Sequence, residues 1–318
     1  MKEHPEVSEW LLEEDQPSVR YVALTELQGR RPTSTESKEA KQKIPTRGWA
    51  SDIMELQGQD GRWQSRPKGS LYGPKYTATN WMALVLSDLG VDRSNTGIKK
   101  TAELYFKEWM PDPPVENIFH DEVCIVGNTA RMLTRFGYAD DRRVKKLFDR
   151  LVEDQKEDGG WHCFKSDHGT LDCWEALAAY AALPKQKRTR SISRSIEKGV
   201  EFYLERRLFD DGEPRYAPWF RFHYPLHYYY DILVGLDVIT ALGYAGDRRL
   251  GPALEILDEK MNPDGTWSME RHHPDIGPGA NYSLRKRPRS FGLEPEGRPS
   301  KWITLRALLV KQRVKNAT

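Results

Sequence analysis

The sequence predicts an all-α fold in which six inner helices are ringed by six outer helices. Three observations lead to this prediction. Runs with the period of two that marks a β-strand are almost absent from the 318 residues. Helical patterns that are apolar over most of their circumference alternate along the chain with amphipathic ones. A short motif, Gln-x-x-Asp-Gly-x-Trp, recurs where amphipathic patterns end, as expected for a repeated two-helix unit.

The elements follow one another in pairs. The inner helices are expected at 17–29, 76–89, 121–136, 170–183, 226–242 and 299–312. The outer helices are expected at 5–14, 36–57, 96–109, 141–155, 192–208 and 248–260. Gly90, Gly137 and Gly243 come after inner patterns, where a left-handed residue ends many helices. Asp141 and Asp247 then open outer helices with an acidic side chain, which the helix dipole favours.

Closure into a ring follows from the number of pairs. An open stack of repeats would need polar caps at both ends. Six inner helices can instead close, with the short first helix beside the last inner one in the outer layer. We therefore expect one domain over residues 1–318, with a long basic loop at about 261–298.

The repeated motif reads QGQDGRW at 57–63, QKEDGGW at 155–161 and MNPDGTW at 261–267. Its tryptophans lie 98 and then 106 residues apart, which is two units of about fifty residues each time. Asp-Gly supplies a tight turn because glycine takes a positive φ without strain. We expect the tryptophan to pack back on the helix end and the glutamine to satisfy free backbone groups. The motif is therefore interpreted as a structural clasp.

The connections between helices are unequal. Links from inner to outer helices are mostly short, whereas those from outer to inner helices are long. The long ones are 58–75, 110–120, 156–169, 209–225 and 261–298. In a ring all five fall on one face, together with the N-termini of the inner helices. Because long loops on a rigid scaffold commonly carry function, this face is predicted to be the mouth of a cavity.

Composition limits the classes of function. Charged residues make up 30% of the chain and nearly cancel, to a net charge of +2, which argues against an extended nucleic-acid surface. No apolar run approaches the roughly 20 residues of a membrane-spanning helix. Three cysteines and no leader of the secretory kind favour the cytoplasm. No phosphate-binding loop, dinucleotide fingerprint or Gly-x-Ser-x-Gly elbow is present, so no cofactor is predicted.

The motif and its placement resemble the QW repeat of squalene–hopene cyclases, and equally the repeat of protein prenyltransferase β-subunits. Short bacterial and archaeal prenyltransferase/squalene oxidase repeat proteins are also similar. The resemblance covers nearly the whole chain and implies an (α/α)6 toroid. It further implies a terpenoid cyclase-like or prenyltransferase-like protein that encloses an isoprenoid or other apolar chain in a central cavity. One alternative is a non-catalytic toroid that binds a lipid or a protein partner. Another is a zinc-dependent prenyl or thiol transferase, which would usually need a helical partner subunit.

The first candidate catalytic residue comes from that resemblance. Class II terpene cyclases protonate an alkene with an Asp-x-Asp-Asp acid at the start of an inner helix. The nearest match is Gly169-Thr-Leu-Asp172, followed by Glu175-Ala-Leu177, and only Asp172 of the three acids remains. A carboxylic acid in this role must be kept protonated by burial and a neighbouring like charge. Asp172 as a plain helix N-cap is the alternative.

A second candidate site opens the fifth inner helix. The stretch FHYPLHYYYD at 222–231 holds four tyrosines, two histidines and one aspartate. On a helix, His227 and Asp231 are spaced i and i+4 and share a face. An aspartate that holds a histidine tautomer makes an acid–base pair. The alternative is a hydrogen-bonded core pair with tyrosine rings at the rim.

Further residues are predicted to bind the ligand. Aromatic side chains expected to line the cavity are Tyr76, Trp81, Trp174, Tyr230 and Trp302. Basic residues expected to hold an anionic head group at the mouth are Arg285, Arg287 and Lys301. The alternative for the basic run is a solvated loop.

The prenyltransferase resemblance calls for a zinc site of Asp, Cys and His ligands at inner-helix ends. The candidates are Asp121, Cys124, Cys173 and His227. Their spacings do not match the Asp-x-Cys of that family, and single cysteines in apolar helices are mostly buried hydrophobes. No metal site is therefore predicted.

Overall fold

The computed structural model describes residues 5–63, 71–111, 122–210, 212, 216–271 and 293–317. The regular elements in these ranges are helices. Pairing between extended segments there is limited to isolated bridges, such as that of Trp161 with Thr170. The all-α prediction is confirmed for this part of the chain. None of its helices is long and apolar enough to span a bilayer.

The inner layer consists of helices that are buried over nearly their whole circumference. They are α2 (Pro17–Val22), α5 (Thr79–Asp88), α7 (Val123–Leu133), α9 (Glu175–Ala182), α11 (Ile232–Ile239) and α13 (Lys301–Ala317). Three of them continue into one π-helical turn, at Ala23–Leu27, Thr134–Tyr138 and Thr240–Tyr244. The predicted glycines end this layer as expected: φ is 85° at Gly90, 96° at Gly137 and 105° at Gly243.

The outer layer is amphipathic. It comprises α1 (Pro5–Leu11), α3 (Thr35–Lys43), α4 (Trp49–Met54), α6 (Thr96–Leu104), α8 (Arg142–Glu153), α10 (Arg190–Glu205) and α12 (Gly251–Glu259). Asp141 caps α8 by accepting from the Arg143 amide, and Asp247 accepts in the same way from the Arg249 amide. The acidic helix starts predicted at these two positions are confirmed.

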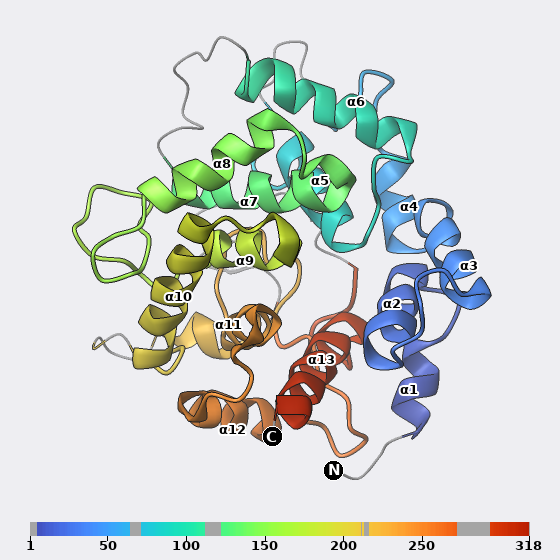
Figure 1. Cartoon of the computed structure of the whole chain (residues 1–318). Coiled ribbons are helices and arrows are strands. Elements are labelled where there is room, and N and C mark those ends of the chain that lie inside the picture. The colour runs from blue at the N-terminus through green and yellow to red at the C-terminus, as the bar shows by residue number, and fades with distance from the viewer. Residues whose placement is uncertain are drawn as a thin grey trace.

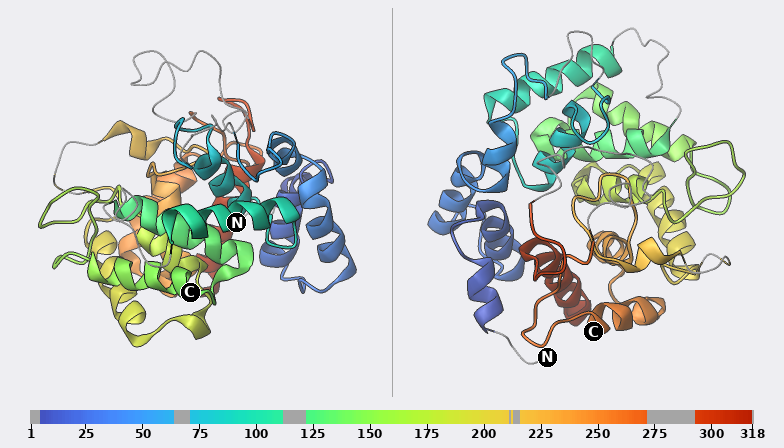
Figure 2. Two further views of the ribbon diagram at one scale, coloured as in Figure 1. Left: turned by 90° about the horizontal axis from the view of Figure 1, so that it is seen from above. Right: turned by 180° about the vertical axis from the view of Figure 1, so that it is seen from behind.

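The two layers are arranged around a common centre (Figure 1). Successive inner helices contact one another from α5 through α7, α9 and α11 to α13, and α13 also contacts α2. Outer helices lie against inner partners: α3 on α2, α6 on α5, α8 on α7, α10 on α9 and α12 on α11. The short first helix, α1, packs on α13 as predicted. The view from behind in Figure 2 shows the same outer helices at the rim.

The repeated motif is a clasp between consecutive units. The indole N–H of each motif tryptophan donates to the carbonyl ten residues earlier, in the last turns of the preceding outer helix. The acceptors for Trp63, Trp161 and Trp267 are the carbonyls of Ile53, Leu151 and Leu257, at 2.7, 2.7 and 2.8 Å. These bonds satisfy carbonyls that a helix C-terminus leaves without an intrahelical donor.

The motif glutamines extend the clasp to the next outer helix. Gln57 Nε2 donates to the Gly61 carbonyl at 3.1 Å and to the Gly97 carbonyl of α6 at 3.1 Å. Gln155 Nε2 reaches the Gly159 carbonyl at 2.7 Å and the Ser195 carbonyl of α10 at 2.9 Å. The glycine of each turn has a positive φ, of 86° at 61, 89° at 159 and 84° at 265. The structural role predicted for the motif is thus confirmed.

Several predicted helix bounds are wrong. The fourth inner helix, expected at 170–183, begins only at Glu175, and the last, expected to end at 312, runs to Ala317. The outer helix expected at 36–57 is broken into α3 and α4, because Pro45 follows α3 and Gly48 has a φ of 72°. The fifth inner helix begins at Ile232 instead of 226, because His227 has a φ of 52°, which no right-handed helix contains. This later start changes the geometry of the candidate site.

Candidate functional site

A central cavity of about 350 Å³ lies between the inner helices. Its walls come from α5, α7, α9, α11 and α13, and from the turn that follows α2. Aromatic lining is supplied by Trp174, Tyr224 and Trp302. The rings of Tyr224 and Trp302 are stacked, with centroids 4.5 Å apart. Trp174 and Trp302 therefore lie where the sequence predicted, on the cavity wall.

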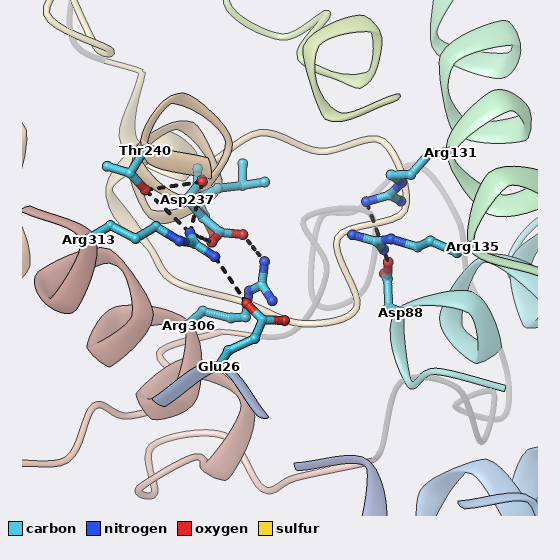
Figure 3. A network of polar contacts seen from close by, with 10 residues as sticks. Glu26, Asp88, Arg131, Arg135, Asp237, Thr240, Arg306 and Arg313 are labelled. Atoms are coloured by element: carbon cyan, nitrogen blue, oxygen red, sulfur yellow. Dashed lines mark hydrogen bonds and ion pairs between the residues drawn. The ribbon is translucent and has the colours of Figure 1, made fainter. Parts of the chain in front are cut away.

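Charged side chains form two groups on the cavity wall, beside apolar residues of α9, α11 and α13 (Figure 3). The first joins α5 to α7 with its π-turn. Asp88 forms an ion pair with Arg135, and its Oδ1 lies 3.5 Å from Arg131 Nη1. Arg131 also donates to Asn128 Oδ1 at 3.0 Å, and its guanidinium lies 5.0 Å from the centroid of Trp174. Arg131 is 3% exposed, and its Nε–H has no acceptor among the described residues.

The second group joins α11 to α13 and to the turn after α2. Asp237 forms an ion pair with Arg306 and another, at 2.8 Å, with Arg313 Nη1. Arg313 Nη2 lies 3.3 Å from Glu26 Oε2. Burial alone would raise the pKa of Asp237, but the charges and hydrogen bonds of the two arginines hold this pKa below its ordinary value. Asp237 is therefore ionised, and its charge is shared by two cations.

The arginines and carboxylates of the cavity wall are equal in number. The two groups hold four guanidinium groups against three carboxylates, and Asp231 is a fourth carboxylate on the same wall. A buried N–H without an acceptor costs free energy, because the donor has lost water and gained nothing in return. The Nε–H of Arg131 is thus a donor on the cavity wall that the described residues leave without an acceptor.

A histidine–aspartate pair lies on the same wall. His223 Nδ1 lies 3.0 Å from Asp231 Oδ2, and both side chains are buried. Asp231 is also the N-cap of α11: its Oδ1 accepts from the Val234 amide at 2.8 Å. The sequence predicted such a pair but with His227 as the histidine, and this pairing is wrong. Because α11 starts only after Asp231, residues 227 and 231 do not share a helical face.

His227 lies instead in an aromatic cluster at the N-terminal end of α5. Its ring centroid is 5.4 Å from that of Tyr76 and 5.3 Å from that of Trp81. Its carbonyl accepts from Asn128 Nδ2 at 2.9 Å. Burial, followed by the charges of His223, Arg131 and Lys75, lowers the pKa of His227 to about 3. This histidine is therefore neutral over the physiological range.

Asp172 is exposed, so it lacks the burial that a protonated acid requires. Its Oδ1 accepts from Trp219 Nε1 at 2.7 Å. It also lies too far before α9 to cap that helix, which starts at Glu175. Glu175 is 1% exposed, and its carboxyl has no hydrogen-bond partner in the described ranges. Burial, and then the charge of Cys163, raises the pKa of Glu175 well above its ordinary value.

The buried acid near this helix start is thus Glu175. A sequence signal for it existed, since it is the one charged residue in the apolar pattern EALAAYAA. Its burial follows from the close approach of α7 and α9: a side chain at Gly127 would meet the Glu175 backbone at 2.7 Å. The next turn of α7 places Arg131 in the central cavity.

The remaining predicted ligand-binding residues fall elsewhere. Tyr230 is buried and donates to the Leu208 carbonyl at 2.8 Å, outside the cavity lining. Lys301 is held in ion pairs at 2.7 Å with Glu13 and 2.6 Å with Asp15, so it joins α13 to the N-terminal segment. The positions of Arg285, Arg287 and Asp121 are outside the described residues. Within the described part of the chain, no cluster of histidines, cysteines and acids is suited to a metal ion.

A second hollow, the mouth pocket, lies beside the N-terminal ends of α5 and α7 and has a volume of about 310 Å³. It is lined mainly by Tyr72, Lys75, Trp81, Cys124, Cys163 and Tyr228. Lys75 Nζ lies 4.4 Å from the Tyr228 ring centroid. Trp81, which the sequence predicted to line the central cavity, lines this pocket instead, and the buried Tyr76 packs against it with ring centroids 4.9 Å apart.

No family model and no curated protein matches the chain. Two solved structures are similar over most of its length. One is the apo type II terpene cyclase MstE from Scytonema, at 14% identity and a TM-score of 0.32, covering 85% of this chain and 96% of that chain. The other is a substituted form of that cyclase with geranylgeranyl dihydroxybenzoate, its substrate, at 12% identity and a TM-score of 0.31, covering 85% and 95%. Because both TM-scores are low, the function of this chain is inferred from its own cavity and side chains.

Proposed function

We propose that the central cavity binds a small molecule with an anionic group at one end and an apolar body at the other. The observation that carries the proposal is Arg131: a buried guanidinium on the cavity wall, with one N–H lacking an acceptor in the described ranges. Carboxylate and phosphate oxygens are the strongest acceptors for such a donor. Trp174 and Trp302 supply the apolar wall on which the rest of the molecule would pack.

The cavity size and lining narrow the class of ligand. Small-molecule pockets are roughly 300–1,000 Å³, so a cavity of about 350 Å³ belongs to the lower end. A long apolar chain would also have to bury the charged groups around Asp88 and Asp237 without giving them acceptors or donors. A short isoprenoid phosphate, diphosphate or carboxylate fits better than a long hydrocarbon such as squalene.

We further propose proton transfer by His223. Asp231 holds the proton on Nδ1 of this histidine, which leaves Nε2 as the basic nitrogen. A histidine oriented by a carboxylate is the commonest acid–base arrangement in enzymes. Because His223 lines the cavity, it is placed to exchange a proton with the bound molecule. This pair takes the place that the sequence had assigned to His227 with Asp231.

Binding is tested with a panel of short prenyl diphosphates, monophosphates, carboxylates and the parent alcohols, by calorimetry. Substitution R131Q replaces the guanidinium by a neutral amide with fewer donors, for which we expect a loss of about 1.5–3 kcal/mol, or roughly 10- to 150-fold in Kd. The matched control is R150Q on the outer helix α8, where Arg150 pairs with Asp154 away from the cavity lining. Equal affinity for alcohols and phosphates, or an unchanged Kd in R131Q, would show that the anion site is wrongly placed.

Catalysis is tested separately with the best-bound member of that panel. In H223Q and D231N we expect binding to persist and turnover to fall by at least tenfold. H223Q removes the imidazole, whereas in D231N the asparagine still caps α11 but fixes the wrong tautomer of His223. H168Q is the control, since that histidine is exposed. If wild-type protein binds ligands yet converts none, the cavity is a binding site without chemistry, and the proton-transfer proposal fails.

A further inference from the structure

All the cysteines of the chain lie close to one another, although they come from three different segments. Cys124 is in the first turn of α7, Cys163 follows the clasp tryptophan Trp161, and Cys173 lies just before α9. The sulfur atoms of Cys163 and Cys173 are 3.6 Å apart, and the three thiols are free. The local pairing of Trp161 with Thr170, with a hydrogen bond of 2.9 Å, brings these two cysteines together.

The three thiols differ in access. Cys124 and Cys163 are half-buried and line the mouth pocket, whereas Cys173 is 4% exposed. The pocket has an aromatic wall that includes Trp81 and Phe164. A small neutral molecule that enters it therefore meets Cys163, while Cys173 stands behind as a protected neighbour.

Access to the pocket and hydrogen bonding together identify Cys163 as the nucleophile. Hydrogen bonds from the thiols of Cys124 and Cys173 lower the pKa of Cys163 to about 3. Their bonding to Cys163, followed by burial, raises the pKa of both other thiols. Glu175 nearby is kept protonated by burial and by the Cys163 charge, which raise its pKa. The cluster thus carries one negative charge, on its accessible sulfur, and thiolates are the reactive form of cysteine.

We propose that Cys163 and Cys173 form a redox-active pair that reduces a hydroperoxide and closes into a disulfide. The Cys163 thiolate attacks the distal peroxide oxygen, the O–O bond breaks, and the leaving alkoxide takes a proton from solvent to become an alcohol or water. This leaves a sulfenic acid on Cys163. The Cys173 sulfur then displaces the sulfenic hydroxyl group, which leaves as water with the Cys173 proton. Two thiols are oxidised and one peroxide is reduced.

The geometry favours this partner over Cys124. A disulfide requires a distance of about 2.0 Å between its sulfur atoms. The sulfurs of Cys163 and Cys173, which are 3.6 Å apart, therefore need to approach by only about 1.6 Å. The sulfur of Cys124 lies 3.8 Å from Glu122 Oε2, and this carboxylate disfavours the thiolate form of Cys124. The disulfide would link the segment that follows Trp161 to the residues just before α9. The inference does not depend on the ligand of the central cavity.

The test uses the reduced full-length protein, titrated with hydrogen peroxide, then unfolded and alkylated with N-ethylmaleimide. We expect a product that is lighter by two hydrogen atoms and takes one maleimide in place of three, with peptide mapping showing a Cys163–Cys173 bond. It should form roughly tenfold faster in the folded protein than in guanidinium, because the fold supplies the thiolate.

Variants separate the roles of the three thiols. In C173S the reaction should stop at the sulfenic acid, which dimedone traps on Cys163. C124S keeps a hydroxyl donor beside Cys163 and should still form the Cys163–Cys173 bond, and circular dichroism verifies the fold of each variant. Three maleimides after peroxide treatment, a bond that involves Cys124, or equal rates in folded and unfolded protein would each overturn the proposal.

Discussion

The burial of His227 makes a quantitative prediction about acid stability. The unfolded chain protonates this histidine near its ordinary pKa of 6.5, whereas the folded protein does so only near pH 3. A neutral buried histidine therefore favours the fold fully above pH 6.5, and this contribution is lost as the pH falls from 6.5 towards 3. The loss is about 1.4 kcal/mol for each pH unit. Between pH 7 and pH 5 it amounts to about 2 kcal/mol.

The perturbation is H227N. Asparagine cannot be protonated and tolerates the φ of 52° found at this position. It loses ring packing against Tyr76 and Trp81 at every pH, so the diagnostic quantity is the change in the free energy of unfolding with pH. From pH 7 to pH 5 the wild-type protein should lose about 2 kcal/mol more than the variant.

The assay is urea unfolding followed by tryptophan fluorescence at several pH values, with Tm from calorimetry as a second measure. Scaled to 318 residues, an unfolding entropy of about 2.1 cal/mol/K per residue converts the difference to about 3 °C in Tm. H168Q controls for an exposed histidine. Parallel pH profiles for H227N and wild type would refute the reasoning, because they would mean that the folded protein protonates His227 as readily as the unfolded chain.

Three further predictions concern single residues. The raised pKa of Glu175 makes the folded state hold a proton that the unfolded state releases above about pH 4.5, so the free energy of unfolding falls as the pH rises. Glutamine cannot be ionised, so urea unfolding should show E175Q more stable relative to the wild-type protein at pH 8 than at pH 5. G159A and G243A should each cost about 1 kcal/mol or more, because both have a positive φ, and G159A should cost more than G243A, because only at 159 would the new Cβ meet α10, at 2.5 Å. W161F should lower the free energy of unfolding by about 1–3 kcal/mol, because it removes the indole donor of the Leu151 carbonyl, as chemical denaturation can measure.

Much of the fold could be predicted from local patterns. Helix type depends on whether one face or the whole circumference is apolar, and both properties are periodic in the chain. The clasp could be interpreted from seven residues because its turn glycine and its tryptophan act within one helix end. The bonds of its glutamine to the next outer helix appeared only in the structure. The exception was the break between α3 and α4, where Pro45 and Gly48 interrupted a pattern that was otherwise helical.

The candidate site was less accessible to such reasoning. Arg131, Asp88 and Asp237 are charged residues inside apolar patterns, and this was a usable signal that a polar cavity existed. Their partners, however, lie far along the chain: Arg135 is 47 residues from Asp88, and Arg306 is 69 residues from Asp237. No local pattern selects such pairs.

The histidine–aspartate pair also could not be identified from local pattern, although its residues are close together in the sequence. The stretch from 222 to 231 contained both histidines and the aspartate, and the helical spacing rule selected His227. The observed chain takes a left-handed turn at this residue and starts α11 only after Asp231, which brings His223 to the carboxylate instead. The sequence by itself determined the helices, their order and the clasps, because these depend on periodicity and turn chemistry. Only the tertiary structure decided which charges share the cavity and which cysteines touch, because those contacts form when distant helices pack around one centre.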